Sequence, residues 1–302
     1  MAATAALPSA STNAEAGPSA PPAPSAAAAA AVFKRLHPAS YLARYLAEGY
    51  RADGRKVGEW RDVSVNAGSV STADGSALVR MGDTTMVCGI KAEIAEPSSA
   101  APTHGYIVPN IDLPALASSR FKPGPPGDEA QVYSNCLNDV IVSSQVLNPA
   151  SLCISAGHAV WALYIDVVCI NYDGNAFDAA VLAVMAALRN TRLPKAVYDP
   201  NTNKTTCVRG ETYPLSLGRT LLACTFGIFQ SKTLLPDPSS FETPLLPTTI
   251  TIALDEEGTA CLVRQEGLGG VVGKTGKEVL GDAWGAAEDR CRALREVLKE
   301  ST

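Results

Sequence analysis

The sequence is poor in the side chains that most often build catalytic or metal sites. It has only three histidines, His37, His104 and His158, which lie before a proline, in a long loop and ahead of a strand. A Ser-His-Asp arrangement is therefore not indicated. The eight cysteines include no close pair, the nearest two being Cys153 and Cys169, which argues against the paired spacing of zinc and redox sites. We expect neither nucleophilic hydrolysis nor a bound metal or other cofactor.

Strong net charge and long apolar runs are also missing. The net charge is −5 and the sequence pI about 5.3, so any RNA-binding site must be a local feature. No apolar run approaches the roughly 18 residues of a membrane-spanning helix, and we expect no membrane partner. The first 31 residues carry one acid, Glu15, and no basic residue, which is unlike a secretory signal or a transit peptide. We predict that residues 1–36 form a disordered tail rich in Ala, Pro and Ser.

The patterned part of the chain divides into two halves, residues 37–194 and 195–302, in which strands precede a helix. Apolar alternation over residues 60–94, broken by Ala-Asp-Gly and Met-Gly-Asp turns, is typical of an antiparallel meander. Helical spacing marks residues 128–147 and 176–190. The sequence therefore predicts one α+β domain built of two similar sheet-and-helix layers.

Residues 268–275, LGGVVGKT, approach the P-loop pattern but have Leu268 where the first glycine is needed. Only 27 residues follow Thr275, which leaves no room for a second strand with a magnesium-binding Asp. Thr275 and Glu278 instead form a capping box. We interpret the segment as a glycine-rich entry to the last helix rather than as a nucleotide site.

The isolated acids are explained by structure more readily than by catalysis. Asp166 lies in the apolar segment YIDVVCI, where a buried carboxylate is costly unless it is hydrogen-bonded. Asp178 falls in the first turn of a predicted helix, where the helix dipole favours an acid. Residues 255–257 precede Gly258 in what we predict to be a solvated hairpin. We interpret each of these acids as structural.

The segment from His104 to Ala130, HGYIVPNIDLPALASSRFKPGPPGDEA, has too much Pro and Gly for regular structure and is long enough for a functional loop. Arg120 and Lys122 offer phosphate contacts there. Phe121 between them offers a face for base stacking, the second element of single-strand binding. We predict Arg120 and Lys122 as RNA-binding residues. On local grounds, a purely structural loop explains the segment nearly as well.

Four segments together resemble the RNase PH family: RADGRKVGEWR, VSTADGSALVRMGDTTMVCGIKAE, VPNIDLPALASSRFKPGPPGDEAQV and INYDGNAFDAAVLAVMAALRNTRLP. From about Tyr41 to the last helix, the chain is most similar to the non-catalytic ring subunits of the eukaryotic RNA exosome. The resemblance implies an RNase PH-like fold, of the ribosomal protein S5 domain 2-like type, in a six-membered pseudo-hexameric ring. The implied partners are other RNase PH-type ring subunits, KH- and OB-type cap subunits, the hydrolytic nuclease of the exosome and single-stranded RNA.

The resemblance also implies which catalytic residues to look for. Active members carry two acids in a segment of the form Leu-Asp-Leu followed by Glu and Asp, and an Arg beside Ser that holds phosphate. Here the stretch PLSLGRTLLACTFGIF has Ser216 where the first acid is expected, and the next acid is Asp237. The phosphate-holding pattern is replaced by NPASLCIS. The phosphate clamp and the acid each contribute about two to four powers of ten to the rate. Because both patterns are replaced here, we expect no catalytic residue in this chain.

The resemblance thus implies a catalytically inactive subunit that completes the exosome ring and lines its RNA channel. The exosome trims and degrades RNA from the 3′ end, in rRNA maturation and mRNA turnover, and the implied locations are nucleus, nucleolus and cytoplasm. Two alternatives stay open. One is an active phosphate-dependent 3′-to-5′ exoribonuclease, and the other is a solitary RNA-binding protein outside any complex.

Overall fold

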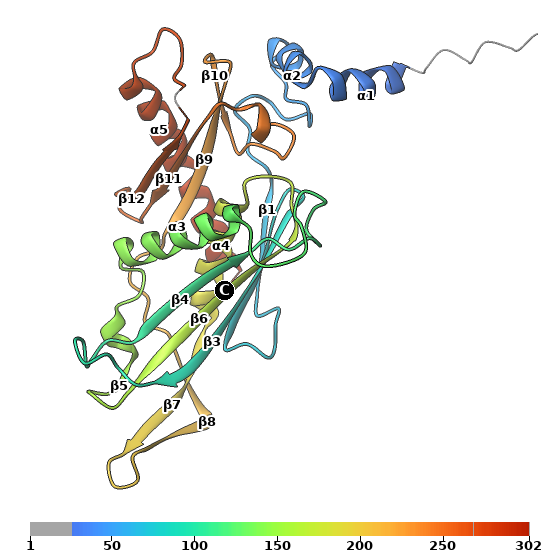
Figure 1. Cartoon of the computed structure of the whole chain (residues 1–302). Helices are drawn as coiled ribbons and strands as arrows, with labels where there is room; N and C mark the ends of the chain where they lie inside the picture. Colours follow the sequence, from blue (N-terminus) through green and yellow to red (C-terminus); the bar gives the residue numbers. More distant parts are fainter. Residues whose placement is uncertain (1–25, 268, 302) are drawn as a thin grey trace, which may run out of the picture.

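The first of two packed sheets is formed by the N-terminal half of the chain (Figure 1). The computed structural model describes residues 26–267 and 269–301. The first sheet has the strand order β1-β2-β3-β6-β4, and the short β5 pairs with β6. Neighbouring strands are antiparallel except β4 and β6. The strands are β1 Val63–Ala67, β2 Gly75–Met81, β3 Thr84–Ala95, β4 Tyr106–Asp112, β5 Cys153–Ser155 and β6 Ala159–Asn171. The predicted meander over residues 60–94 is confirmed as β1 to β3.

The second sheet has the order β10-β9-β11-β12 and is antiparallel throughout. Its strands are β9 Leu222–Phe229, β10 Thr233–Pro236, β11 Thr248–Leu254 and β12 Ala260–Glu266. Between the sheets in sequence, β7 Arg192–Asp199 and β8 Lys204–Pro214 form a ribbon that projects beyond the first sheet (Figure 1). Two strands alone are marginally stable. The ribbon is tied to the body by stacking of His158 on Tyr198, with ring centroids 4.8 Å apart, and by a hydrogen bond from Trp161 Nε1 to the Tyr213 hydroxyl.

Helix α4, Ala176–Asn190, lies at the centre of the core, and every residue from Ala176 to Leu188 is buried. It packs against β2 and β3 on one side and β9 on the other. Its many alanines let both sheets approach closely. Helix α3, Asp128–Ser144, packs on β4 and β12, and helix α5, Gly276–Glu300, packs on β9, β11 and β1. The predicted α+β architecture of two sheet-and-helix layers is confirmed.

The N-terminal segment is helical, including a part where a disordered tail was expected. Residues Ala26–Leu36, within the predicted tail, form α1, and Pro38–Ala47, beyond it, form α2. The prediction for residues 1–36 is therefore wrong for this part, because a run of alanines has the highest helix propensity. The rest of that prediction, residues 1–25, lies outside the described residues. Leu42 of α2 is fully buried against residues of the second half, namely Phe229, Leu235 and Leu246.

Strand β4 also lies in a segment that was expected to be irregular. It pairs with β6 despite Pro109, because β4 is the edge strand of its sheet and a missing amide is tolerated there. Two one-turn 3-10 helices, Pro149–Leu152 and Thr243–Leu245, complete the described elements. In residues 26–267 and 269–301, no helix combines the length and the apolarity needed to cross a bilayer.

Candidate functional site

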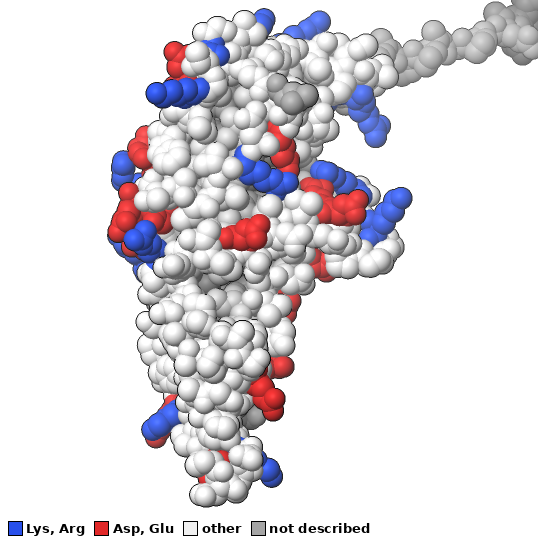
Figure 2. All heavy atoms as spheres, turned by 60° about the vertical axis from the view of Figure 1, so that its left-hand side comes forward, with Lys and Arg blue, Asp and Glu red and all other residues white. Residues whose placement is uncertain are grey.

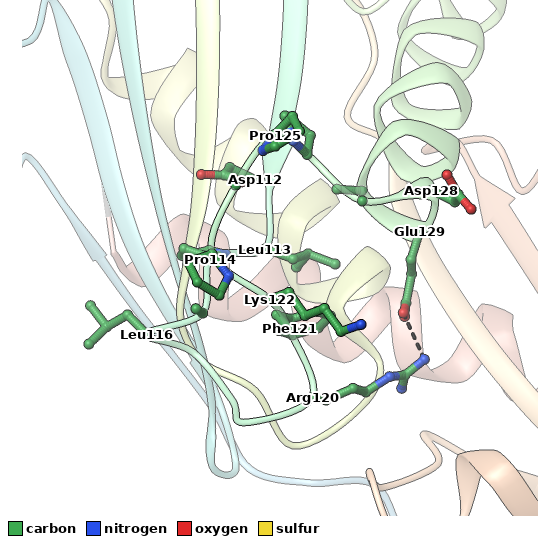
Figure 3. A pocket seen from close by; sticks show the side chains of 16 residues that line it. Asp112, Leu113, Pro114, Leu116, Arg120, Phe121, Lys122, Pro125, Asp128 and Glu129 are labelled. Atoms are coloured by element: carbon green, nitrogen blue, oxygen red, sulfur yellow. Dashed lines mark hydrogen bonds and ion pairs between the residues drawn. The ribbon is translucent and has the colours of Figure 1, made fainter.

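The predicted RNA-binding residues share one cavity. The loop of residues 113–127 and the first turn of α3 enclose about 680 Å³ of open space (Figure 3). Arg120 and Lys122 both line it. The loop contains four prolines, at positions 114, 123, 125 and 126, which fix φ and stiffen the wall. The structure therefore brings the two cations together on a rather rigid support.

Arg120 is held by neighbouring side chains. Its Nη2 donates to Glu129 Oε2 at 2.7 Å, the contact drawn as a dashed line in Figure 3, and its Nη1 donates to the Tyr172 hydroxyl at 3.3 Å. The Arg120 side chain is nevertheless 50 % exposed, against 27 % for Glu129. Lys122 is exposed. Both cations are therefore accessible, but Arg120 already has an anionic partner.

Phe121 is held by packing against the body of the molecule. Its ring packs edge-on against Tyr172, with centroids 5.0 Å apart and planes at 80°, and it is half-buried against the core. This packing anchors the loop. Phe121 also lines the cavity, and its stacking on a base stays a prediction.

Glu129 joins the loop to the helices behind it. Its Oε1 accepts hydrogen bonds from the hydroxyls of Tyr133, at 3.2 Å, and Tyr172, at 3.4 Å. Burial is the main cause that raises the pKa of both tyrosines, that of Tyr172 to about 12, so both remain protonated donors at neutral pH. We call Arg120, Glu129, Tyr133 and Tyr172 the loop latch.

The stretch PLSLGRTLLACTFGIF divides into an exposed approach and a buried strand, β9. Ser216 is exposed and lies outside the strand. After β9 the chain turns back through β10, and Asp237 follows directly; its amide donates to the Thr225 carbonyl at 2.9 Å. The expectation that Ser216 marks a lost acid, with no other acid in reach, is therefore wrong. Pairing of β9 with β10 brings residue 237 back beside the strand.

Asp237 is fully buried and paired with an arginine. Arg61 Nη2 donates to its Oδ1 at 2.6 Å and Arg61 Nε to its Oδ2 at 2.8 Å, a bidentate contact. Asn175 Nδ2 also donates to Oδ1, at 2.8 Å. Burial acts to raise the pKa of Asp237, but the hydrogen bonds and charge of Arg61 prevail and lower it below its ordinary value. The carboxylate is thus anionic, desolvated and occupied on both oxygens.

Glu242 is held in the same way by Arg51. Arg51 Nε donates to its Oε1 at 2.9 Å, Arg51 Nη2 binds its Oε2, and neither side chain is exposed. Asp237 and Glu242 follow the strand β10 as an acid and then a Glu, but Thr243 stands where the pattern of active members has a second Asp. Sequence reasoning missed these acids, although this spacing was the available signal. We call the two pairs, Arg61 with Asp237 and Arg51 with Glu242, the arginine locks.

A third buried acid, Asp178, lies next to Asp237. Asn175 Nδ2 donates to its Oδ2 at 2.7 Å, and the amide and hydroxyl of Thr225 donate to it at 2.6 Å and 2.8 Å. Burial raises the pKa of Asp178 to about 6. Asn175 precedes α4 as predicted, but its side chain bonds these acids and makes no helix cap. The structural interpretation of Asp178 is confirmed by these contacts.

A cavity of about 80 Å³ opens on the far side of Asn175, lined by Thr225, Thr243, Arg264 and other side chains. The carboxylates of Asp178 and Asp237 are not part of its lining. Close packing explains the separation: at Gly174, where φ is +81°, an added Cβ would lie 2.6 Å from the backbone of residues 238–240. The loop that carries Asp237 therefore sits tightly on the turn ahead of α4.

Comparison with known proteins identifies the family of this chain. Residues 59–194 match the model of the 3′ exoribonuclease family, domain 1, named RNase PH. The exosome complex component rrp43 of Schizosaccharomyces pombe is 44 % identical over 225 residues, which cover 74 % of this chain and 83 % of that protein. The chain belongs to the RNase PH family.

Other RNase PH relatives extend the match to solved structures. The exosome complex component Rrp42 of Methanothermobacter thermautotrophicus is 39 % identical over 219 residues, covering 72 % of this chain and 80 % of that protein. A chain of the Archaeoglobus fulgidus exosome with RNA bound to the active site superposes with a TM-score of 0.74 and 30 % identity, covering 85 % of this chain and 96 % of that one. The resemblance and the RNase PH-like fold predicted from sequence are confirmed.

The remaining candidates in this RNase PH chain have structural explanations. Asp166 is exposed on the outer face of the first sheet, 3.4 Å from Asn110 Nδ2, so its expected burial is wrong. Asp255 is buried rather than solvated, because it accepts the amides of its own turn and pairs with Arg219 at 2.7 Å. In the described residues no three His, Cys, Asp or Glu side chains are placed to hold a metal ion.

The P-loop-like segment also has a structural role. The capping box of Thr275 and Glu278 is confirmed. Lys274 pairs with Asp282, so its ammonium group is engaged within α5. Leu268 lies outside the described residues. The interpretation as a glycine-rich entry to the last helix stays in place.

Proposed function

We propose that this RNase PH family chain is a catalytically inactive ring subunit of an exosome core. The observation that carries the proposal is the pair of arginine locks. Asp237 and Glu242 have no exposed surface, and both oxygens of each accept from a guanidinium. A carboxylate that is buried and hydrogen-bonded in this way is not accessible to a metal ion or a leaving group. The relatives that support assembly are named exosome complex components.

The surface supports membership of a ring. Tyr106, Val108 and Tyr164 are exposed on the adjacent strands β4 and β6, and Val108 lies directly opposite Tyr164. Neighbouring exposed apolar side chains are typical of protein interfaces. Figure 2 shows few charged side chains on the lower part of the face it presents, whereas both signs alternate across the middle. The proposed neighbours are other RNase PH-type ring subunits, with KH- and OB-type cap subunits and a hydrolytic nuclease in the same complex.

Within the ring, the proposed contribution of this chain is to complete the circle and guide single-stranded RNA past Arg120 and Lys122. The overall charge is negative, so a local pair of cations on a stiff loop is the feature that suits phosphate contact. The processes served would be 3′-to-5′ processing and degradation of rRNA and mRNA. We propose the same locations as expected above, nucleus, nucleolus and cytoplasm.

The test is charge reversal in the assembled complex. Arg120→Glu with Lys122→Glu should weaken protection of RNA from an added nuclease while the complex still elutes as one species. It should also lower the salt dependence of RNA binding by about 0.7 in log-log slope for each lost phosphate contact. Lys204→Glu with Lys232→Glu, which reverses two exposed lysines outside the cavity and changes the net charge by the same amount, is the matched control. Unchanged protection and an unchanged slope would show that the two loop cations are scaffold only.

A further inference from the structure

We propose that Glu129 competes with RNA phosphate for Arg120, so that the loop latch sets the RNA affinity of this site. The inference rests on the proposed RNA role of Arg120. It assigns a function to Glu129, one of three acids, with Asp112 and Asp128, that line the same cavity as Arg120 and Lys122.

The geometry of the latch carries the inference. Glu129 Oε2 lies 2.7 Å from Arg120 Nη2, the distance of a charge-assisted hydrogen bond. A phosphate oxygen is the same kind of partner for a guanidinium as a carboxylate oxygen. The hydroxyl of Tyr172 accepts from Nη1 of the same side chain at 3.3 Å. Two of the five N–H donors of the guanidinium, one on each terminal nitrogen, are therefore engaged. A phosphate that takes either of these two donors must displace its present partner, and the charge of Glu129 weakens the attraction of Arg120 for any phosphate that approaches.

The latch is also built to stay aligned. The hydroxyls of Tyr133 and Tyr172 donate to Glu129 Oε1 and hold the carboxylate toward Arg120. Phe121, the residue after Arg120, packs on Tyr172, and this contact fixes the loop next to Arg120. Because Arg120 is half exposed, its ion pair is of the weak class that an approaching anion can open. Lys122, exposed on the same cavity, remains available for a first contact.

The test compares two single-charge removals in the full chain. Glu129→Gln removes the competing charge and keeps the shape of the side chain. Asp128→Asn removes the adjacent charge from the same cavity wall and serves as the matched control. Binding of a fluorescein-labelled single-stranded oligoadenylate is followed by anisotropy at several salt concentrations. Glu129→Gln should lower Kd about two- to five-fold relative to Asp128→Asn, and should raise the salt slope by about 0.7, one further phosphate contact.

The double variant Arg120→Gln/Glu129→Gln shows whether the gain in RNA affinity depends on Arg120. If Glu129 acts through Arg120, the gain disappears in this double variant. Equal gains in affinity for Glu129→Gln and Asp128→Asn, no gain, or a gain that persists without Arg120 would each overturn the inference.

The single variant Arg120→Gln separates the latch proposal from the RNA-binding role of the loop, on which the latch proposal rests. If it weakens binding while Glu129→Gln has no effect, the latch idea fails and the RNA role of the loop stands; if it changes nothing, the RNA role itself fails. Thermal melting of each variant confirms that it is folded.

Discussion

Arg61 and Asp237 form a buried ion pair, and removing one partner should lower the stability of the fold. Asp237→Asn leaves the Arg61 guanidinium buried without its anion, since the two side chains are 6 % and 0 % exposed. Removing one partner of such a pair costs about 3–5 kcal/mol, whereas replacing both by apolar residues costs much less. We therefore predict that Asp237→Asn lowers the free energy of unfolding by about 3 kcal/mol or more. Urea titration measures it, and Arg61→Met/Asp237→Leu should lose less than the single variant. Equal losses would mean that the lock contributes no coupling.

Asp178 gives a prediction for pH. Burial raises its pKa in the folded chain to about 6, from an ordinary value of 3.8. Between these values the folded chain holds a proton that the unfolded chain has lost. The contribution is full below pH 4 and is lost as pH rises through 6, and it amounts to about 3 kcal/mol. Asp178→Asn should remove this part of the pH dependence of urea unfolding between pH 4 and 7.5, while Asp83→Asn, at an exposed acid, leaves it in place. An unchanged profile in Asp178→Asn would show that the buried acid does not titrate in this range.

At the scale of elements, helix α2 docks on the second half of the chain through one fully buried side chain, that of Leu42. Leu42 is fully buried between α2 and the second half of the chain. Leu42→Ala should cost about 2–5 kcal/mol locally, as a large-to-small change in a core does. We predict faster amide exchange and protease cleavage over residues 38–50, measured by mass spectrometry, with β6 unchanged. Leu36→Ala, at a side chain that is 68 % exposed, is the control. If both variants exchange at the same rate, α2 is held by other contacts.

Elements with a strong hydrophobic periodicity were predictable from the sequence. Contacts that depend on strand pairing, or on residues far apart in the chain, were not. The meander, α4 and the capping box of α5 follow from local patterns that agree with the fold. The placement of Asp237 beside Thr225 depends on the β9–β10 hairpin, which linear spacing does not reveal. The same holds for Arg51, whose partner Glu242 lies in the other half of the chain. Arg120 and Lys122 were predicted in one loop, but Glu129 as the partner of Arg120 appears only in three dimensions.

At the scale of the whole molecule, the acids Asp237 and Glu242 are buried, whereas the cations Arg120 and Lys122 are exposed. The arginine locks tie residues 51–61 to residues 237–242, so the N-terminal entry to the first half also fixes the loop of the second. The loop latch holds Arg120 at the surface, on the edge of the first sheet. This division suits a subunit that binds and positions RNA for chemistry performed elsewhere in the complex.

The central claim, that this chain does not cut RNA, is tested most directly by measuring nucleoside diphosphates. The complex that co-purifies with the chain is incubated with a 3′-labelled single-stranded RNA and inorganic phosphate, and the purified chain is assayed in parallel. We predict that the chain alone releases no nucleoside diphosphate, and that the better tolerated Arg61→Met/Asp237→Leu in this subunit leaves the phosphate-dependent rate of an intact complex unchanged. Release by the chain alone, or a rate that falls with this double variant in a complex of normal size, would contradict the account.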